Sequence, residues 1–353
     1  MTQGTVSAIS ASPVSGAEAP LAESPKRKTA VLLVNLGTPD GTDYWPMRRY
    51  LSEFLSDRRV IEWPVAIWQP ILQGIVLSTR PKKSGAAYES VWNKERNESP
   101  LRTFTREQGE KLAELLADEP NVIVDWAMRY GNPSIEEVTS RLLAQGCEQI
   151  VMFPLYPQYS ATTTATVNDK FFEALMKLRY QPASRTVPDY HNEPVYIDAL
   201  ATSIERHLAA TGSNPEIVIA SYHGIPQSYA KKGDPYPKQC LETTRLLRER
   251  LGWDEKKLIT CFQSRFGPEE WLQPYTDKTV EKLGKEGVKS IAVFNPGFVA
   301  DCLETLEEIA VEAGHIFKEA GGEHFTHIPC LNASDLGMKV IETMVRRELQ
   351  GWI

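Results

Sequence analysis

Residues 30–39 read AVLLVNLGTP, a short apolar run that ends in Gly and Pro. Residues 217–226 read IVIASYHGIP and repeat that design in the later part of the chain. Short apolar runs bounded by turn-forming residues are typical of buried strands in a parallel sheet. We therefore expect each run to be a strand of an α/β unit.

Two more pairs of segments recur in the same order around these strands. RYGNP at 129–133 is matched by RFGP at 265–268, and GCEQIVMF at 146–153 is matched by GVKSIAVF at 287–294. Three matches in one order indicate an internal duplication. Because strands alternate with amphipathic stretches of helical length, the sequence predicts an α/β fold. We expect two similar doubly wound lobes whose parallel sheets face a central cleft, with ligands bound at the strand ends.

Predicted elements cover both halves of the chain. Strands are expected at 30–34, 122–126, 150–153, 217–221, 258–262 and 291–294, with weaker candidates at 184–187 and 324–328. Helices are expected at 107–116, 135–145, 170–178, 196–209, 241–251, 277–285, 303–318 and 336–349. We divide the chain into a disordered tail at 1–28, a first lobe at 29–190 and a second lobe at 191–353, which includes the terminal helix.

The first half carries an insertion. Leu36 and Arg129 are 93 positions apart, whereas the matching His223 and Arg265 are 42 apart, so the first half is 51 residues longer here. The extra residues, placed at about 57–104, include three Trp and the cationic run RPKK at 80–83. They could pack a small core of their own. We favour an apolar lip over the cleft, with cations that could hold carboxylates.

Composition excludes several classes of protein. The chain has 39 Lys and Arg against 46 Asp and Glu, a net charge of −7, which argues against a nucleic-acid partner. Five scattered Cys without a C-x-x-C pair indicate a reducing compartment. Neither a continuous apolar run of 18 residues nor a secretory signal is recognisable in the sequence. We expect a cytoplasmic protein.

Candidate chemical groups lie at the predicted strand ends. His223 follows a buried strand at the position where the other half has Leu36. Asp301, Glu304 and Glu308 have the spacing i, i+3 and i+7, which predicts one face of a helix after the strand at 291–294. A lone His is often a core residue, and acidic residues often only complement a helix dipole. The alternative is a path for a divalent cation or for protons.

Longer motifs resemble one known family. They are LLVNLGTP at 32–39, YPQYS at 156–160, SYHGIP at 221–226, GDPYP at 233–237, QSRFGPEEWL at 263–272 and DCLETL at 301–306. In this order, over about residues 29–350, they resemble the ferrochelatase family.

The resemblance implies a fold of two flavodoxin-like lobes and a reaction. The family inserts ferrous iron into protoporphyrin IX to make protohaem, which is the terminal step of haem biosynthesis and releases two protons. Iron is then a substrate, and no permanently bound cofactor is expected. The resemblance places the metal site at His223 and Glu304, with Glu308 and Asp301 as further acidic positions. Porphyrin contacts map onto Leu36, Tyr88, Arg129 and Trp271, and propionate contacts onto Arg80 and Ser99.

Two departures from the family pattern are informative. Cys302 stands where eukaryotic members have His, so that His is not needed for the chemistry. Ala161 follows YPQYS where iron–sulfur members have Cys, and we expect no cluster. The five Cys are then expected to be small buried apolar residues.

Two other functions remain open at this stage. One is a bilobal protein that carries metal or tetrapyrrole without turnover, and the other is a chelatase for coproporphyrin or a corrin precursor. The Trp-rich lip at about 60–77 with a single cationic group suits a ring with two propionates better than one with four. The same lip is a candidate for peripheral contact with a membrane.

Overall fold

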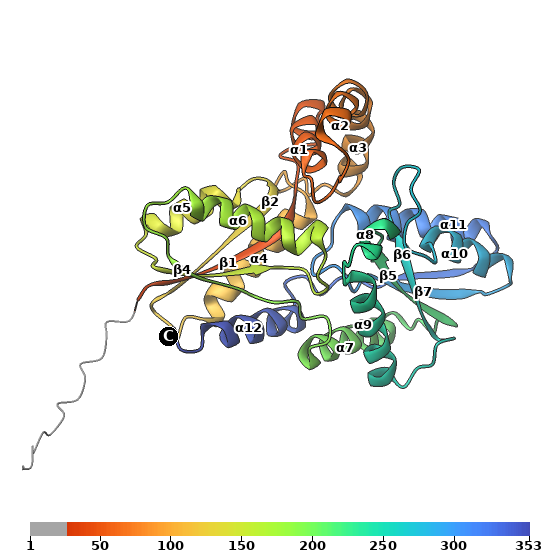
Figure 1. Cartoon of the computed structure of the whole chain (residues 1–353). Coiled ribbons are helices and arrows are strands. Elements are labelled where there is room, and N and C mark those ends of the chain that lie inside the picture. The colour runs from red at the N-terminus through yellow and green to blue at the C-terminus, as the bar shows by residue number, and fades with distance from the viewer. Residues whose placement is uncertain (1–26) are drawn as a thin grey trace, which may run out of the picture.

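A computed structural model describes residues 27–353 of this chain. The predicted tail at 1–28 therefore lies outside the described residues except for its last two positions. Two four-stranded parallel sheets form the centre of the molecule (Figure 1). The first has the order β2-β1-β3-β4 and the second β6-β5-β7-β8, so the same arrangement occurs twice. The predicted α/β fold with two similar lobes is confirmed.

Each predicted strand exists, and most are longer than predicted. The first sheet contains β1 (Thr29–Thr38), β2 (Val122–Gly131), β3 (Gln149–Pro154) and β4 (Ala183–Thr186). The second contains β5 (Ile217–His223), β6 (Leu258–Gln263), β7 (Ser290–Phe294) and β8 (His324–His327). In β1, Val31 and Leu33 join one core, and Ala30, Leu32 and Val34 join another. Both faces of this central strand are buried, which explains its continuous apolar run.

Helices cover both faces of each sheet. On one face, α5 (Ile135–Ala144) and α6 (Thr166–Met176) cover the first sheet. The matching face of the second sheet is covered by α10 (Thr276–Lys285), the π-helix η3 (Glu304–Ala313) and α11 (Gly314–Glu319). The opposite faces share α4 (Pro100–Leu115), α7 (Pro194–Thr211), α9 (Tyr236–Leu251) and α12 (Asp335–Leu349).

The terminal helix joins the two halves. We assigned it to the second lobe, whereas the structure packs α12 on β3 and α4 of the first and also on α7 (Figure 1). Its buried side chains belong to one apolar core that contains residues from both sheets. The lobes are therefore not separate hydrophobic units, because the cover of the first sheet comes from the end of the chain.

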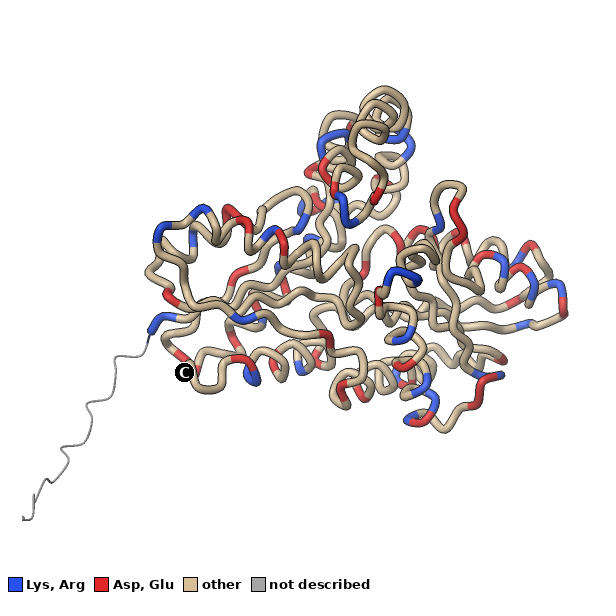
Figure 2. The backbone as a smooth tube through the Cα atoms, viewed as in Figure 1, with Lys and Arg blue, Asp and Glu red and all other residues tan. Residues whose placement is uncertain are grey.

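A helical excursion leaves the first sheet after β1. It comprises α1 (Tyr44–Ser56), α2 (Val65–Ile71), the short π-helix η1 (Leu72–Val76) and α3 (Leu77–Val91), and it projects from the lobes in Figure 1. It begins before the predicted start at 57, and α4, which covers the sheet, already begins at Pro100. Met47, Leu51, Leu72 and Trp92 help to form a core of its own. Lys and Arg are interspersed with Asp and Glu along this excursion, as in the rest of the described chain (Figure 2).

Contacts from the excursion also reach the second lobe. The hydroxyl of Tyr229, in the short helix α8 (Gln227–Lys231), donates to the carbonyl of Val60 at 2.9 Å. Lys232 pairs with Glu62, and the indole of Trp63 donates to Glu269 at 3.3 Å. The excursion therefore bridges from the first lobe to the second.

The YPQYS and GDPYP motifs form a joint between the halves. The carboxylate of Asp234 accepts hydrogen bonds from Ser160 Oγ at 2.9 Å and from Ala161 N at 2.8 Å, at the start of the π-helix η2 (Ala161–Ala165). Gln158 donates to Thr243 at 3.1 Å beside them. The two motifs therefore fix the relative placement of the sheets. Within residues 27–353, the helices are all too short or too polar to cross a bilayer.

Candidate active site

The predicted chemical groups come from strand ends and from the helix after β7. His223 is the last residue of β5, Leu36 and Arg129 lie near the ends of β1 and β2, and η3 carries Glu304 and Glu308. In a parallel sheet the carboxyl ends of all strands lie at one edge. The topology thus brings Leu36 and Arg129 to the carboxyl edge of the first sheet, and His223 and the start of η3 to the carboxyl edge of the second.

The imidazole of His223 has a defined hydrogen-bonding direction. Its Nδ1 lies 2.6 Å from the carbonyl oxygen of Gly224. A carbonyl can only accept, so Nδ1 carries the hydrogen and Nε2 of the neutral ring keeps its lone pair. The rings of Trp271 and Phe298 lie with their centroids 6.4 and 6.5 Å from that of His223. The half-buried His223 therefore offers a basic nitrogen between aromatic walls.

A buried amide cluster supports this edge of the second sheet. Gln263 Oε1, at the end of β6, accepts from Ser221 Oγ at 2.7 Å and from Asn295 Nδ2 at 2.8 Å. Gln263 Nε2 donates to the backbone carbonyl of Glu304 at 2.9 Å. This one side chain links β5, β7 and η3. Gln263 is not among the residues predicted for the site, although it begins the QSRFGPEEWL motif.

The acidic helix is wound differently from the prediction. Its first part, η3, is a π-helix with hydrogen bonds between residues i and i+5, and Asp301 precedes it. The expected single face for Asp301, Glu304 and Glu308 assumed an α-helical repeat, and that expectation is wrong. Glu304 and Glu308 both lie within the π-helix, whereas Asp301 lies before its first residue and outside its repeat.

Glu308 belongs to the same polar group as His223. Its carboxylate accepts from Ser264 N at 2.7 Å and from Ser264 Oγ at 2.5 Å. Burial raises the pKa of Glu308, and the negative charge of Glu304 adds to the rise. The Ser264 hydrogen bonds and the positive charge that His223 can carry act in the opposite direction. His223, Glu304 and Glu308 are thus close enough to affect one another electrostatically.

Asp301 lies in a separate buried network. Its carboxylate accepts from Thr305 Oγ1 at 2.9 Å, Asn332 Nδ2 at 2.7 Å and Cys330 N at 3.3 Å. These bonds tie the start of η3 to the loop after β8. Asp301 therefore positions the acidic helix, and its oxygens are already occupied by donors from the protein.

Aromatic residues of the excursion lie opposite Glu304. Tyr88, on α3, is buried and makes an edge contact with Tyr50 of α1 at 6.4 Å between centroids. Burial raises the pKa of the Tyr50 hydroxyl, and the carboxylate of Glu304 raises it further. Burial likewise raises the pKa of Tyr88, with smaller contributions from Tyr50 and Glu304. The excursion thus places an apolar wall with buried hydroxyl groups beside the acidic helix.

Arg80 is a cation without a carboxylate partner in the described part of the chain. Its guanidinium stacks on Phe266 at 4.6 Å, and Nη1 is buried without a hydrogen-bond partner. Burial lowers the pKa of Arg80. A buried donor of this kind favours an anionic ligand.

Four further sequence candidates have mainly structural contacts. Ser99 caps α4 by accepting from Arg102 N at 3.2 Å, and Arg129 is paired with Asp57 at 2.5 Å. Leu36 packs between the first sheet and the excursion. Trp271 packs near His223, and its buried indole N–H has no partner in the described residues.

Four of the five cysteine side chains are buried as expected. Cys147, Cys240, Cys261 and Cys302 are buried, Cys330 is partly exposed, and all five are free thiols. In residues 27–353, no three His, Cys, Asp or Glu side chains are gathered closely enough to hold a metal ion together.

Comparisons with known proteins agree with these observations. The family model described as Ferrochelatase matches residues 28–349. The chain is 76% identical over 325 residues to a protein named ferrochelatase from Chelativorans sp., covering 92% of each chain. It is 74% identical over 326 residues to the ferrochelatase of Brucella anthropi, covering 92% of this chain and 93% of that one.

A solved structure shares the fold at low sequence identity. It is described as SirB from Bacillus subtilis with Fe3+ and has a TM-score of 0.54 at 13% identity. The match covers 91% of this chain and 95% of that one. This likeness supports the two-lobe architecture.

Proposed function

The chain belongs to the ferrochelatase family of metal chelatases, and on that premise we propose that it inserts ferrous iron into protoporphyrin IX with release of two protons. Membership establishes metal insertion into a porphyrin as part of haem biosynthesis. What we propose beyond membership is the identity of the metal ion, the identity of the porphyrin and the roles of the individual residues. The observation that carries it is that Gln263 and Ser264, at the end of β6, hold the backbone of Glu304 and the carboxylate of Glu308 beside the strand end that bears His223.

Metallation requires that two pyrrole N–H groups lose their protons. In our proposal the lone pair on Nε2 of His223 accepts a pyrrole proton, because the Gly224 carbonyl holds the hydrogen on Nδ1. A ring bent by the walls of the site would present its nitrogen lone pairs to the metal, at a cost met by binding energy. Iron stays divalent throughout, so the proposed reaction needs no redox cofactor or nucleotide.

We assign Glu304 to the metal ion and Glu308 to the protons. Glu304, on the helix η3 that contacts α3 of the excursion, brings the divalent cation to the ring, since carboxylate oxygens suit hard cations. Glu308 relays protons, a role supported by its raised pKa and by its position near His223. Asp301 acts only indirectly in this scheme by holding the start of η3.

The environment of Arg80 is evidence for a porphyrin substrate with few carboxylate groups. Its guanidinium belongs to α3 of the excursion, and one propionate would satisfy its buried Nη1. Protoporphyrin has two propionates and coproporphyrin four, so the second ring would leave more carboxylates to be paired. We therefore propose protoporphyrin as the preferred substrate.

Steady-state kinetics test the substrate assignment. The measurement is kcat/KM for iron or zinc insertion into protoporphyrin and into coproporphyrin under identical conditions. The proposal expects the larger value for protoporphyrin. Equal or more efficient turnover of coproporphyrin would reassign the substrate, and tight porphyrin binding without any product would instead favour a carrier.

We also propose that the excursion touches a membrane surface. Trp63 is 42% exposed, Val65 50%, Ile67 55% and Ile75 64%, and all four lie in or beside α2 and η1. Exposed apolar residues at the tip of a projecting element favour peripheral binding, which would suit a poorly soluble ring. Cosedimentation with phosphatidylcholine vesicles should fall when Ile67 and Ile75 are replaced by Ser. The free thiols support a cytoplasmic setting.

A further inference from the structure

A cavity of about 540 Å³ lies beside α1, between the excursion and the first sheet. One wall is a stripe of α1 residues at helical spacing, which runs from Arg48 and Arg49 through Ser52 to Ser56. The other walls are Arg129 of β2 and Lys170 of α6. None of the groups proposed to act on iron or on the pyrrole nitrogens lines this space.

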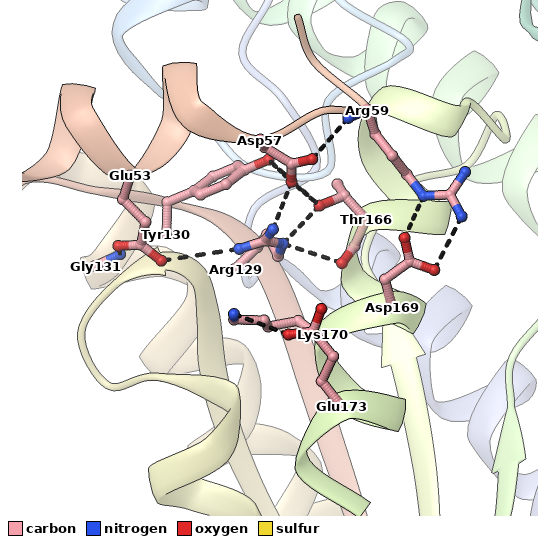
Figure 3. Close-up of polar contacts among 10 residues, drawn as sticks. All are labelled: Glu53, Asp57, Arg59, Arg129, Tyr130, Gly131, Thr166, Asp169, Lys170 and Glu173. Atoms are coloured by element: carbon pink, nitrogen blue, oxygen red, sulfur yellow. Dashed lines mark hydrogen bonds and ion pairs between the residues drawn. The ribbon is translucent and has the colours of Figure 1, made fainter. Parts of the chain in front are cut away.

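The charge of the lining favours an anion. Four cations (Arg48, Arg49, Arg129 and Lys170) and two carboxylates (Glu53 and Asp57) line the space. Lys170 is also paired with Glu173 at 3.0 Å (Figure 3), so the charge available to a ligand comes mainly from Arg48 and Arg49. Asp57 is held by Arg129 and by hydroxyl groups, as Figure 3 shows, so it is already neutralised within the protein. Arg49 is exposed and has no carboxylate within ion-pair distance in the described residues. The cavity thus retains a surplus of positive charge.

Arg129 supplies a buried donor to the cavity. Its side chain is 9% exposed, Nε donates to Thr166, and Nη2 donates to Asp57 (Figure 3). Nη1 has only Glu53 nearby, at 3.8 Å, which is too long for a hydrogen bond. An N–H donor on a nine-tenths buried guanidinium therefore remains free to bind an oxygen in the cavity.

Hydroxyl groups of the lining are also free to donate. Ser52 Oγ accepts from Gln73 at 3.2 Å, and Ser56 Oγ accepts from Gln69 at 3.1 Å. Each hydroxyl keeps its own hydrogen available, because its oxygen is used only as the acceptor. Guanidinium, ammonium and hydroxyl donors on several sides of one space match the oxygens of a tetrahedral anion.

We propose that this cavity is a binding site for a phosphate group. Phosphate on a membrane lipid is the favoured source, because Trp45, one helical turn before Arg48 and Arg49 on α1, is 65% exposed, and Trp is enriched at bilayer interfaces. Free inorganic phosphate has the same binding chemistry. The lipid source rests on the membrane contact proposed above, whereas the phosphate site itself depends only on the cavity.

The first experiment measures binding of inorganic phosphate by titration calorimetry, without porphyrin or iron. Arg49→Gln and Lys170→Gln each remove one cation from the rim, and Lys318→Gln, on exposed α11 of the other lobe, is the charge-matched control. We expect each cavity variant to bind phosphate about 10-fold more weakly and the control to match the wild type.

The second experiment separates the sources by cosedimentation. Vesicles contain phosphatidylcholine alone or with about one-third phosphatidylglycerol, which adds an anionic phosphate surface. Selective binding to the anionic vesicles, reduced in both cavity variants and by added free phosphate, assigns the site to lipid. Phosphate binding without that selectivity assigns the site to free phosphate.

Two results would contradict the proposal that this cavity binds phosphate. One is the lack of both phosphate binding and preference for anionic vesicles in the wild type. The other is an equal loss in Lys318→Gln, which would reveal a general charge effect. Neither result depends on metal insertion, so failure of the catalytic proposal and failure of this one are distinguishable.

Discussion

At the scale of single residues, the hydrogen bond from His223 Nδ1 to Gly224 O determines which ring nitrogen is free. Gln263 then fixes the surrounding strand ends through its bonds to Ser221, Asn295 and the backbone of Glu304. A catalytic base needs both a lone pair and a fixed position, and the two features are supplied by different residues.

His223→Ala should lower the rate of metal insertion by at least about 100-fold, because the proposed proton acceptor is removed. Porphyrin affinity should change little, since most of that affinity is apolar. Insertion rate, porphyrin quenching titration and melting temperature are measured on one preparation. A variant that loses stability but keeps its activity per folded molecule would show that His223 is only structural.

Glu304→Gln keeps the size of the side chain but removes its charge and basicity. We expect turnover to fall by at least about 10-fold with unchanged porphyrin affinity, because a neutral amide is a weaker ligand for a divalent cation. The rate is measured over a range of metal concentrations. Wild-type kinetics at every concentration would contradict the assignment of the cation to Glu304.

At the scale of elements, the excursion is anchored by the end of α1. Asp57 directly follows α1 and accepts from Arg129 and from the hydroxyl groups of Tyr130 and Thr166 (Figure 3). Its side chain is 10% exposed and that of Arg129 is 9% exposed. By contrast, Arg59 and Asp169 form a neighbouring pair whose side chains are 40% and 47% exposed.

Asp57→Asn should therefore lower the free energy of unfolding by about 3 kcal/mol at pH 7, because it leaves the buried Arg129 with only the exposed Glu53, 3.8 Å away, as a counter-charge. Asp169→Asn is the matched control and should cost less than about 1 kcal/mol, since its pair is solvated. Urea unfolding at pH 7 measures both. Equal small effects would show that the buried pair does not anchor the excursion.

The same carboxylate predicts a pH dependence. Burial alone would raise the pKa of Asp57, but hydrogen bonds from Thr166 and the backbone of Arg59, with the charge of Arg129, lower it below its ordinary 3.8. A lowered pKa in the folded state stabilises the protein above the unfolded pKa, and this gain is lost as the pH falls through the folded value. The difference in stability between wild type and Asp57→Asn should thus narrow below about pH 3.8. A difference in the free energy of unfolding that stays constant with pH would contradict the link between the ionisation of Asp57 and stability.

At the scale of the whole molecule, one apolar core spans both sheets. Ile341 of α12 is 3% exposed and belongs to that core, so Ile341→Ala should lower the free energy of unfolding by about 3 kcal/mol. Unfolding in guanidinium chloride is monitored by Trp fluorescence and by circular dichroism, and the midpoints from both signals should shift together. Exposed Lys339, on the same helix, supplies the control Lys339→Ala, with an expected change below about 0.5 kcal/mol. Separate transitions would show that the lobes unfold independently.

Local sequence determined the strands, the duplication and the residue types of the site. Apolar runs such as that of β1 can be recognised because both faces of a central parallel strand are buried. His223 and Glu304 stood out because their motifs resemble a family, and the comparisons established that family. Their roles in the reaction remain predictions.

Tertiary structure alone decided how these parts combine. Asp301 lies before the π-helix η3 and binds Thr305, Asn332 and Cys330, apart from Glu304 and Glu308, and an α-helical repeat read from the sequence cannot show this. The placement of α12 on the first sheet and the pairing of Arg129 with Asp57 depend on contacts between residues far apart in the chain. Local periodicity states only which face of an element is apolar, whereas its partner is chosen by the packing of the whole chain.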